Sequence, residues 1–446
     1  MANGPLPPGP PGRLVRGNLP DFARGRLDYM VRCTRDYGDV VALRFGPRRV
    51  FLVNHPDLIE EVLVTQSRHF IKHFALRLNP LVLGKGLLTS EGAFWLRQRR
   101  LIQPAFNRGR LAGYAPTMVA AAERLLASWK AGETRDISKE MMRLTLDIAA
   151  RTLFGADAGA AAGNVAGALQ FLQEAFLVRF ARMVPIPVWL PTPRNLRLRR
   201  AVRQLDDIIY GFIRQRRQSG EDKGDLLSIL LHARDEDDGS RMTDKQVRDE
   251  AMTLFLAGHE TTALALSWTW YLLARHPEAE ARLADEVRAV LGACLPTMED
   301  VPRLRYAEAV VQESMRILPP VYAIGREAIN DCEIGGFRVP KGTTILMSQW
   351  AVQRDPRFFD EPEKFYPERW LGGLAQRLHK YAYFPFGGGP RLCVGNTFAM
   401  LEAVLVLAVI TQRYRFTVVP NHPVEPWATF TLRPKNGILA VLAPRV

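Results

Sequence analysis

A glycine-rich segment with one cysteine, followed at once by an apolar helical pattern, constrains the fold of this chain most strongly. The segment spans residues 386–395 and reads Phe-Gly-Gly-Gly-Pro-Arg-Leu-Cys-Val-Gly. Glycines let the backbone pass close to a neighbouring atom, and the amide groups at a helix start favour negative charge. A metal-binding cysteine needs such surroundings, because the thiolate is the ligand and must stay deprotonated. The segment therefore has the features that a metal-binding thiolate at Cys393 would need.

The neighbours of this cysteine have tasks that fit the prediction. Gly389 and Gly395 would let the backbone wrap the sulfur, and Phe386 would cover it as an apolar lid. Arg391 would pair with an anionic group. A lone cysteine is by default an inert buried residue, and that alternative stands beside the functional one. A phosphate loop is excluded, because the chain has neither G-x-G-x-x-G between a strand and a helix nor G-K-[S/T].

A second segment, Ala251–Leu273, combines an apolar helical pattern with small and polar residues at its centre. Residues 257–262 read Ala-Gly-His-Glu-Thr-Thr. Such residues pack poorly in a core, and this conflict is expected where function overrides local preference. Gly258 would let a ligand approach the helix, and Thr261 offers a hydroxyl. The plain alternative is a helix whose threonine is bonded to the carbonyl four residues earlier and whose glutamate is exposed. The zinc motif H-E-x-x-H is excluded because Ala263 occupies its last position.

Together these segments resemble the cytochrome P-450 family of haem-thiolate monooxygenases. The cysteine segment matches the family's F-x-x-G-x-R-x-C-x-G signature at every fixed position, and residues 257–262 match [AG]-G-x-[DE]-T-[TS]. The resemblance extends over nearly the whole chain. It implies one domain over residues 1–446, mainly α with a minor β part, and with a proline-rich start over about residues 1–20. Haem b would lie between the oxygen-activating helix and the cysteine-loop helix.

The resemblance also implies the roles of individual residues. Cys393 would ligate the iron, and its thiolate would favour O–O cleavage. Ala257 and Gly258 would form the oxygen pocket. Thr261 and Glu260 would be catalytic, with the threonine bound to dioxygen and the glutamate relaying protons.

Further motifs of the family assign the haem-binding arginines and the scaffold. Trp95 and Arg99 match W-x-x-x-R, one helical turn apart, and would reach a haem propionate, as would Arg326. For both arginines an exposed surface position is the alternative. The scaffold triad resembles E-x-x-R plus P-E-R and would be a buried, structural network. Its members are Glu313, Arg316 and Arg369.

One departure from the family is visible before the P-E-R motif. Many members have H-R-D-P, whereas residues 353–356 read Gln-Arg-Asp-Pro. The contact that the histidine makes is therefore in doubt at Gln353.

Periodicity places these motifs in a helix-rich chain. Residues 40–45 and 49–54 are β-rich runs around Gly46 and Pro47, which predicts a hairpin. Helical spacing prevails over residues 56–291, strand-like segments return over residues 332–350, and a helix is expected over about residues 396–411.

Composition limits the cellular setting. The four cysteines are scattered, which suits a reducing cytoplasm, and the chain start lacks a signal or transit pattern. The apolar run 403–410 is far shorter than the ~20 residues of a membrane-spanning helix. We therefore expect a cytoplasmic, monomeric protein of the soluble bacterial type, without a transmembrane anchor or a fused reductase.

The charge balance bears on partners. Lys and Arg number 60 against 46 Asp and Glu, a formal charge of +14. No nucleic-acid-binding module is recognisable, so nucleic acid is not an expected partner. Electrons would come from an acidic ferredoxin or flavodoxin with its reductase, recruited by basic residues that include Arg97, Arg100 and Arg108. The arginines over residues 194–203 are expected to be a solvated helix face.

The expected reaction inserts one oxygen atom from O2 into a hydrophobic small molecule, such as a fatty acid, terpenoid or macrocycle. Substrate contacts are expected in the loop 74–88, in residues 321–324 and 430–432, and on the oxygen helix. The candidates are Phe255, Ala257, Val321, Ile324 and Leu432. Residues 184–193, with Trp189 among prolines, would form an access lid, a membrane-touching patch or a plain loop.

Two other functions of a haem-thiolate protein stay open. A peroxide-using or isomerising enzyme would share the cysteine loop but often lacks the acid and alcohol pair. A non-enzymatic haem sensor would have no need of that pair. Glu260 and Thr261 favour monooxygenation.

Overall fold

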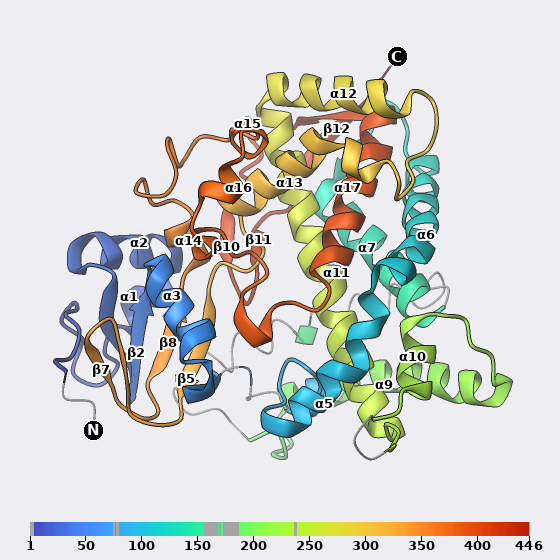
Figure 1. The fold of residues 1–446 in the computed structure, drawn as a ribbon. Helices are drawn as coiled ribbons and strands as arrows, with labels where there is room; N and C mark the ends of the chain where they lie inside the picture. Colours follow the sequence, from blue (N-terminus) through green and yellow to red (C-terminus); the bar gives the residue numbers. More distant parts are fainter. Residues whose placement is uncertain are drawn as a thin grey trace. The chain divides into compact units, whose positions relative to one another are not determined.

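Helices carry most of the structure, a computed structural model that describes residues 4–74, 76, 80–155, 168, 171–172, 187–235 and 239–445. Its contacts divide the chain into two units. The first comprises Met1–Arg77, Gln312–Cys393 and Pro426–Arg433, and the second comprises Leu78–Val311, Val394–Glu425 and Pro434–Val446. Most strands belong to the first unit and the long helices to the second (Figure 1).

The first unit is built on a five-stranded sheet in the order β1-β2-β8-β5-β3. The predicted hairpin is confirmed: Val40 pairs with Val53 and Phe45 with Arg48. β2 and β8 are parallel, whereas the other neighbours are antiparallel. The strands of this unit are β1 (Val40–Phe45), β2 (Arg48–Val53), β3 (Phe70–Lys72), β5 (Ile324–Ala328), β6 (Cys332–Ile334), β7 (Phe337–Val339), β8 (Thr344–Met347) and β10 (Pro426–Ala428), which pairs with β11 (Leu432–Pro434).

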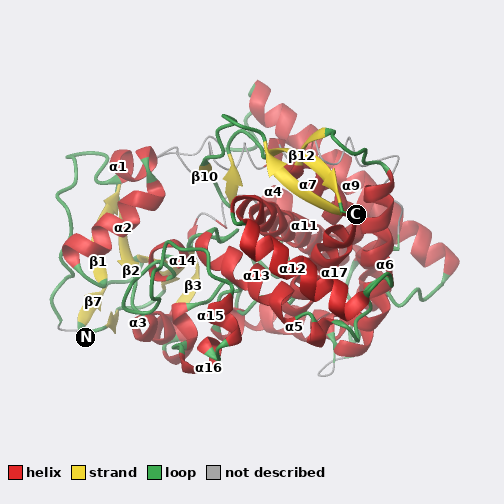
Figure 2. Ribbon diagram, turned by 90° about the horizontal axis from the view of Figure 1, so that it is seen from above, coloured by secondary structure: helices red, strands yellow, loops and turns green. Residues whose placement is uncertain are grey.

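Short helices accompany this sheet, and Figure 2 shows α1 and α2 beside β1 and β2. The prediction of strand-like structure over residues 332–350 is wrong at its end, because Ser348 caps a helical turn there by accepting from the Ala351 N–H. The helices are α1 (Leu19–Arg24), α2 (Arg26–Tyr37), α3 (Pro56–Glu60), α14 (Gln349–Val352), α15 (Glu368–Leu371) and α16 (Leu374–Arg377), and α13 (Arg305–Ile317) belongs to both units.

The second unit is organised around one buried helix, α11. It spans Asp244–Arg275, and a capping box of Thr243 and Gln246 satisfies its first amide groups. α11 packs against α7, α9 and α17, and Figure 1 shows it running between α7 and α17. The helices of this unit are α4 (Pro80–Leu83), α5 (Gly92–Ile102), α6 (Arg108–Ala127), α7 (Ile137–Phe154), α9 (Pro193–Ser219), α10 (Leu226–His232), α11, α12 (Pro277–Leu291) and α17 (Asn396–Arg413), and its strands are β4 (Thr134–Asp136), β9 (Tyr414–Val418) and β12 (Leu439–Pro444).

The helix expected after the cysteine loop is α17, two residues longer than predicted at its end. Among the described residues, α17 is the one helix whose length and apolar composition would allow it to cross a membrane. In this structure 67% of it is buried within the protein. Its side chains form the core of the second unit, for example Leu405, Leu407 and Ile410 at 0% exposure. The overall class, mainly α with a minor β part, is as predicted.

The turn before α9 presents an exposed tryptophan. Trp189 is 73% exposed, and Asn195 Nδ2 donates to the carbonyls of Pro187 and Leu190 at 2.9 Å each. Arg199 Nη2 adds bonds to the carbonyls of Val188 and Trp189. Part of the predicted lid, residues 184–186, lies outside the described residues, so its role as a lid or membrane patch stays a prediction.

Candidate functional site

The loop that carries Cys393 is fixed from both sides in the first unit. The Cys393 N–H donates to Phe386 O at 3.0 Å, and the Gly389 N–H donates to the hydroxyl of Tyr381 at 3.3 Å. Gly389 has φ +64°, and a Cβ there would lie 1.8 Å from Leu63 O. A side chain at Gly389 is therefore excluded both by the backbone conformation and by the packing.

The cysteines differ in their surroundings. Cys33 and Cys332 are buried, and burial raises the pKa of each thiol to about 11, which keeps it protonated. Cys294 and Cys393 are exposed, and neither forms a disulfide. A cysteine that binds a metal must be accessible and must lose its proton. The exposed loop cysteine, Cys393, is therefore compatible with the predicted role. No cluster of three or more His, Cys, Asp or Glu that could hold a metal occurs within the described ranges.

On α11 the burial of the helix is interrupted at the predicted oxygen motif. Ala257 is exposed and Gly258 and Thr261 are half-buried, whereas the residues on either side are mostly buried. A Cβ on Gly258 would meet nothing within 4 Å. Thr261 Oγ1 donates to Ala257 O at 2.8 Å, the back-bond that the plain alternative requires. The same geometry leaves a small, open face with a hydroxyl on an otherwise packed helix.

The acidic neighbour of this face is buried. Glu260 is 6% exposed. His259, on the other side of the helix, donates from Nδ1 to Phe255 O at 2.8 Å, and its own carbonyl accepts from Thr145 Oγ1 at 2.9 Å. The bond from Thr145 joins α7 to the middle of α11 and fixes the helix where its open face lies. Sequence reasoning missed Thr145, because no motif surrounds it.

The predicted propionate ligands lie on regular elements. Trp95 and Arg99 lie one turn apart on α5 and are half-buried, and Arg99 Nε donates to Gln103 Oε1 at 3.4 Å. Arg326 is on β5 and 7% exposed, and its Nη1 donates to Gly325 O at 3.0 Å. Arg391 is half-buried at the end of a short 3-10 turn. The exposed-surface alternative does not hold for Arg326.

The scaffold triad is a buried network in the first unit. Glu313 and Arg316 are 0% exposed, and the Arg316 guanidinium donates to both carboxylate oxygens at 2.8 and 2.9 Å. Arg369 Nε donates to Glu313 Oε1 at 2.9 Å. Trp370 Nε1 donates to Oε2 at 2.9 Å and the Tyr366 N–H to Oε1 at 3.0 Å, two partners that the motifs did not reveal. Each buried charge thus has several partners.

Arg316 is hydrogen-bonded to Gln353, the residue that stands where many family members have histidine. Arg316 Nη1 donates to the carbonyls of Gln353 and Pro362 at 2.8 and 2.6 Å. Gln353 in turn donates from Nε2 to the carbonyls of Met315 and Arg316, both at 3.0 Å. Gln353 therefore satisfies carbonyls at the end of α13, where helices leave such groups unpaired.

The predicted substrate contacts are spread over both units. Phe255 is half-buried on α11, and Val321 and Ile324 are half-buried near β5. Leu432 is fully buried, at 0% exposure, while Phe430 is 43% exposed. Of the loop 74–88, residues 75 and 77–79 lie outside the described residues.

One of the predicted partner-binding arginines is engaged within the protein. Arg97 Nε pairs with Asp235 at 3.0 Å, and its Nη2 donates to Ser240 Oγ at 2.7 Å. Arg100 and Arg108 are exposed. The expectation that Arg97 recruits a partner is therefore not supported by its contacts, because recruitment would have to break a partly buried ion pair.

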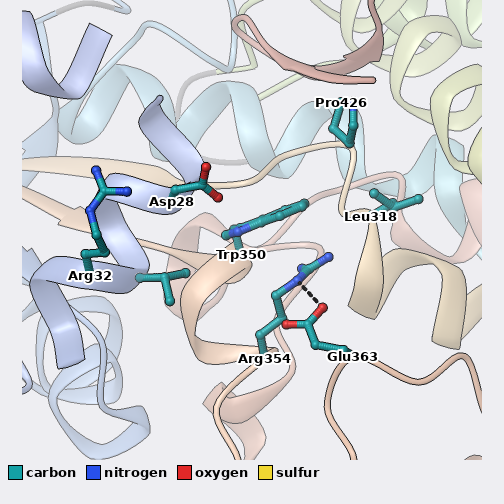
Figure 3. A pocket seen from close by; sticks show the side chains of 8 residues that line it. Asp28, Arg32, Leu318, Trp350, Arg354, Glu363 and Pro426 are labelled. Carbon is teal, nitrogen blue, oxygen red and sulfur yellow. Dashed lines mark hydrogen bonds and ion pairs between the residues drawn. The ribbon is translucent and has the colours of Figure 1, made fainter. Parts of the chain in front are cut away.

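A surface pocket of about 410 Å³ in the first unit is separate from these residues (Figure 3). Among its lining residues is Trp350, whose ring centroid lies 3.4 Å from the Arg354 guanidinium carbon, and Arg354 Nε donates to Glu363 Oε2 at 3.3 Å. None of the predicted site residues is among those that line it. The lining residues are Asp28, Val31, Arg32, Leu318, Trp350, Arg354, Glu363 and Pro426.

An exposed cysteine in a glycine loop, a helix with a small hydroxyl-bearing face and a buried Glu-Arg-Arg network are the features that the sequence predicted for the haem-thiolate class of protein. The sequence profile of the cytochrome P-450 family matches residues 7–441. The chain belongs to this family, whose members are oxidoreductases that use haem.

Curated relatives and solved structures agree with this assignment. The chain is 38% identical to cyclooctatin synthase of Streptomyces melanosporofaciens over 94% of this chain and 91% of that protein. It is 39% identical to cyclooctat-9-en-7-ol 5-monooxygenase of the same organism, over 86% and 84%. Pentalenene oxygenase of Streptomyces avermitilis is 36% identical over 95% and 94%. The crystal structure of the cytochrome P450DA haem domain superposes with TM-score 0.90 at 27% identity, covering 99% of this chain and 98% of that one.

Proposed function

We propose that this monooxygenase oxidises a cyclic terpenoid, holding haem b through Cys393. The single observation that carries the proposal is the open face of α11, where Ala257 is exposed and Gly258 leaves room within an otherwise packed helix. The relatives named for cyclooctat-9-en-7-ol and pentalenene support the substrate class. Because the family profile covers both units, we take residues 1–446 to be one functional domain.

The residues present fit a haem. Cys393 is an exposed sulfur ligand at the end of a fixed loop, and Phe386 precedes it on the same loop. Arg99, Arg326 and Arg391 are cations of the kind that pair with propionates, with Trp95 one turn from Arg99. Gly395 is the N-cap of α17, so the first amide groups of that helix follow Cys393 closely in the sequence. When bound, the haem supplies O2 activation, which a thiolate ligand favours.

The chain's own contribution lies in proton handling and in the exclusion of water. Thr261 Oγ1 holds its proton toward Ala257 O and can accept a second hydrogen bond on the open face. Glu260 is the adjacent buried acid, and in this proposal it relays protons to that hydroxyl. Phe255 and Leu256 pack in the apolar core beside this face and favour a hydrophobic substrate.

Thr261→Val tests this function. The change keeps the side-chain shape but removes the hydroxyl, so product formation with O2 and an electron donor is expected to fall about 10²-fold. The dissociation constants of cyclooctat-9-en-7-ol and pentalenene, measured by spectral titration, are expected to change little. Lauric acid serves as the non-terpenoid comparison. Peroxide-driven turnover by the wild type without any turnover with O2 would favour the peroxide-using alternative instead.

We further propose a cytoplasmic monomer that receives electrons from an acidic ferredoxin or flavodoxin. Arg100 and Arg108 are exposed basic residues that can attract such a partner. Raising the ionic strength from about 0.05 to 0.5 M is expected to slow reduction by ferredoxin, because salt screens exposed charges. The double variant Arg100→Gln/Arg108→Gln should lose most of this salt dependence. Reduction that is insensitive to salt in the wild type would contradict the recruitment.

A further inference from the structure

The turn Gly84–Leu87 is fastened to the first half of α11 by two adjacent buried acids. The Lys85 N–H donates to Asp249 Oδ2 at 3.0 Å, and the Leu87 N–H donates to Glu250 Oε2 at 2.8 Å. The two acids are 3% and 1% exposed. Neither has a part in the oxygen chemistry proposed above, ten residues further along the helix.

Two glycines allow the turn to approach this closely. A Cβ on Gly84 would lie 2.1 Å from the carboxylate carbon of Asp249, and Gly84 also has φ +54°. A Cβ on Gly86 would lie 2.0 Å from Thr253 Oγ1. Any side chain at either position would push the turn away from the helix.

The contacts continue on both sides of the turn. Arg248 Nη1 donates to Val82 O at 2.9 Å, and its Nε donates to Asp206 Oδ1 on α9 at 2.6 Å. Asp249 also accepts from Lys245 Nζ at 2.9 Å. One stretch of α11 therefore binds α4, the turn after it and α9.

The second oxygen of Glu250 is held through α5. Gln98 is 0% exposed, and with its amide oriented to satisfy both neighbours its nitrogen donates to Glu250 Oε1 at 3.3 Å. Its oxygen then accepts from Arg97 Nη1 at 3.2 Å, and Arg97 pairs with Asp235 at 3.0 Å. This chain of contacts explains why Arg97 is engaged inside the protein.

Burying the carboxyl groups of Asp249 and Glu250 lowers the stability of the fold. We therefore ask what these acids do that apolar residues could not, and the answer is that they hold the turn in place. Burial raises the pKa of Glu250 to about 8, and the neighbouring Asp249 adds to that rise. Apolar residues of the same size would be cheaper to bury. The acids provide what apolar residues lack, namely acceptors aimed at two particular backbone amides.

The position of the turn matters for the open face of α11. Leu83 and Leu87 belong to the same apolar cluster as Phe255 and Leu256. Phe255 lies two residues before the exposed Ala257. Movement of the turn would therefore disturb the packing of this cluster, against which Phe255 also packs.

We propose that Asp249 and Glu250 are positioning residues that latch the Gly84–Leu87 turn onto α11 and thereby limit how fast a hydrophobic ligand enters. The significance for catalysis rests on the proposed function. The latch itself is a property of the described contacts and can be tested without turnover.

Hydrogen exchange of the holoenzyme tests the latch. Glu250→Leu removes both carboxylate oxygens of Glu250, including the acceptor of the Leu87 N–H. Amides in the peptide 84–90 are therefore expected to exchange about tenfold faster or more. Glu250→Gln keeps an acceptor for the Leu87 N–H and should restore most of the protection. Asp244→Asn is the matched control, since Asp244 lies on the same helix but is 51% exposed in its pair with Arg217.

Ligand entry gives a second readout. The association rate of 4-phenylimidazole, followed by stopped-flow absorbance, is expected to rise several-fold in Glu250→Leu and to stay unchanged in Asp244→Asn. If Glu250→Leu does not fold, Gly86→Ala displaces the turn from the opposite side and leaves α11 intact. The same two changes are expected for that variant.

The outcomes separate the latch from the proposed function. Faster exchange in peptide 84–90, with α7 and α17 unchanged, together with faster azole entry supports the latch. Equal acceleration in α7 and α17 means a loss of global stability and overturns it, as does unchanged exchange in both variants. Unchanged azole entry despite faster exchange overturns the role in entry. A wild type that shows no azole spectrum contradicts the proposed function, and the exchange data then decide on the turn alone.

Discussion

Cys393→Ala is expected to abolish the absorption band near ~450 nm that reduced, CO-bound protein shows when a thiolate ligates the iron. Alanine removes the sulfur but keeps the loop, because the Cys393 N–H still donates to Phe386 O. Monooxygenase activity should fall to background, since no other described thiol occupies such a loop. The measurement is the CO difference spectrum of purified protein after dithionite reduction.

Cys294→Ala is the matched control. This cysteine is also exposed and outside any disulfide, but it lies after α12 and not in the glycine loop. Its replacement should leave the ~450 nm band unchanged. A band near ~420 nm in the wild type would mean neutral-thiol or histidine ligation and would contradict the assignment of Cys393. A protein that binds no haem at all would contradict the proposed function.

Glu313→Ala is expected to destabilise the protein by about 3–5 kcal/mol, the cost of breaking a buried ion pair. The change would strand the Arg316 guanidinium, which is 0% exposed, and would remove the acceptor for Arg369, Trp370 and the Tyr366 N–H. Unpaired buried charges are the costly part, because water cannot replace the lost partner. Urea unfolding of the holoenzyme, followed by circular dichroism, measures the change.

Asp285→Asn supplies a control with the same i,i+3 spacing on a helix. Asp285 and Arg288 are 72% and 71% exposed and pair at 3.2 Å. Exposed pairs contribute about 0.2–1 kcal/mol, so the unfolding midpoint should hardly move. Comparable losses in the two variants would mean that burial does not set the energy of the Glu313 network. Trp370→Phe removes one hydrogen bond to Glu313 and should cost about 1 kcal/mol.

Sequence alone was sufficient where chemistry demands particular residue types at fixed spacing. Position 389 requires glycine, because its φ is +64° and a Cβ there would collide with the carbonyl of Leu63. The glycine pattern of the cysteine loop can therefore be recognised in the sequence. The small residues in the middle of α11 are equally visible, because they interrupt an apolar pattern. Both signals are local, and the helix-rich order of the chain follows from local periodicity in the same way.

Tertiary structure decided every question that depended on burial or on distant partners. Glu313–Arg316 and Asp285–Arg288 have the same spacing, yet one pair is fully buried and the other exposed. The sequence suggested that Arg97 is a surface charge, whereas in the structure it pairs with Asp235, which lies far along the chain. The latch acids Asp249 and Glu250 carry no motif at all. Burial and pairing arise from residues brought together across long sequence separations, and neither periodicity nor spacing encodes that proximity.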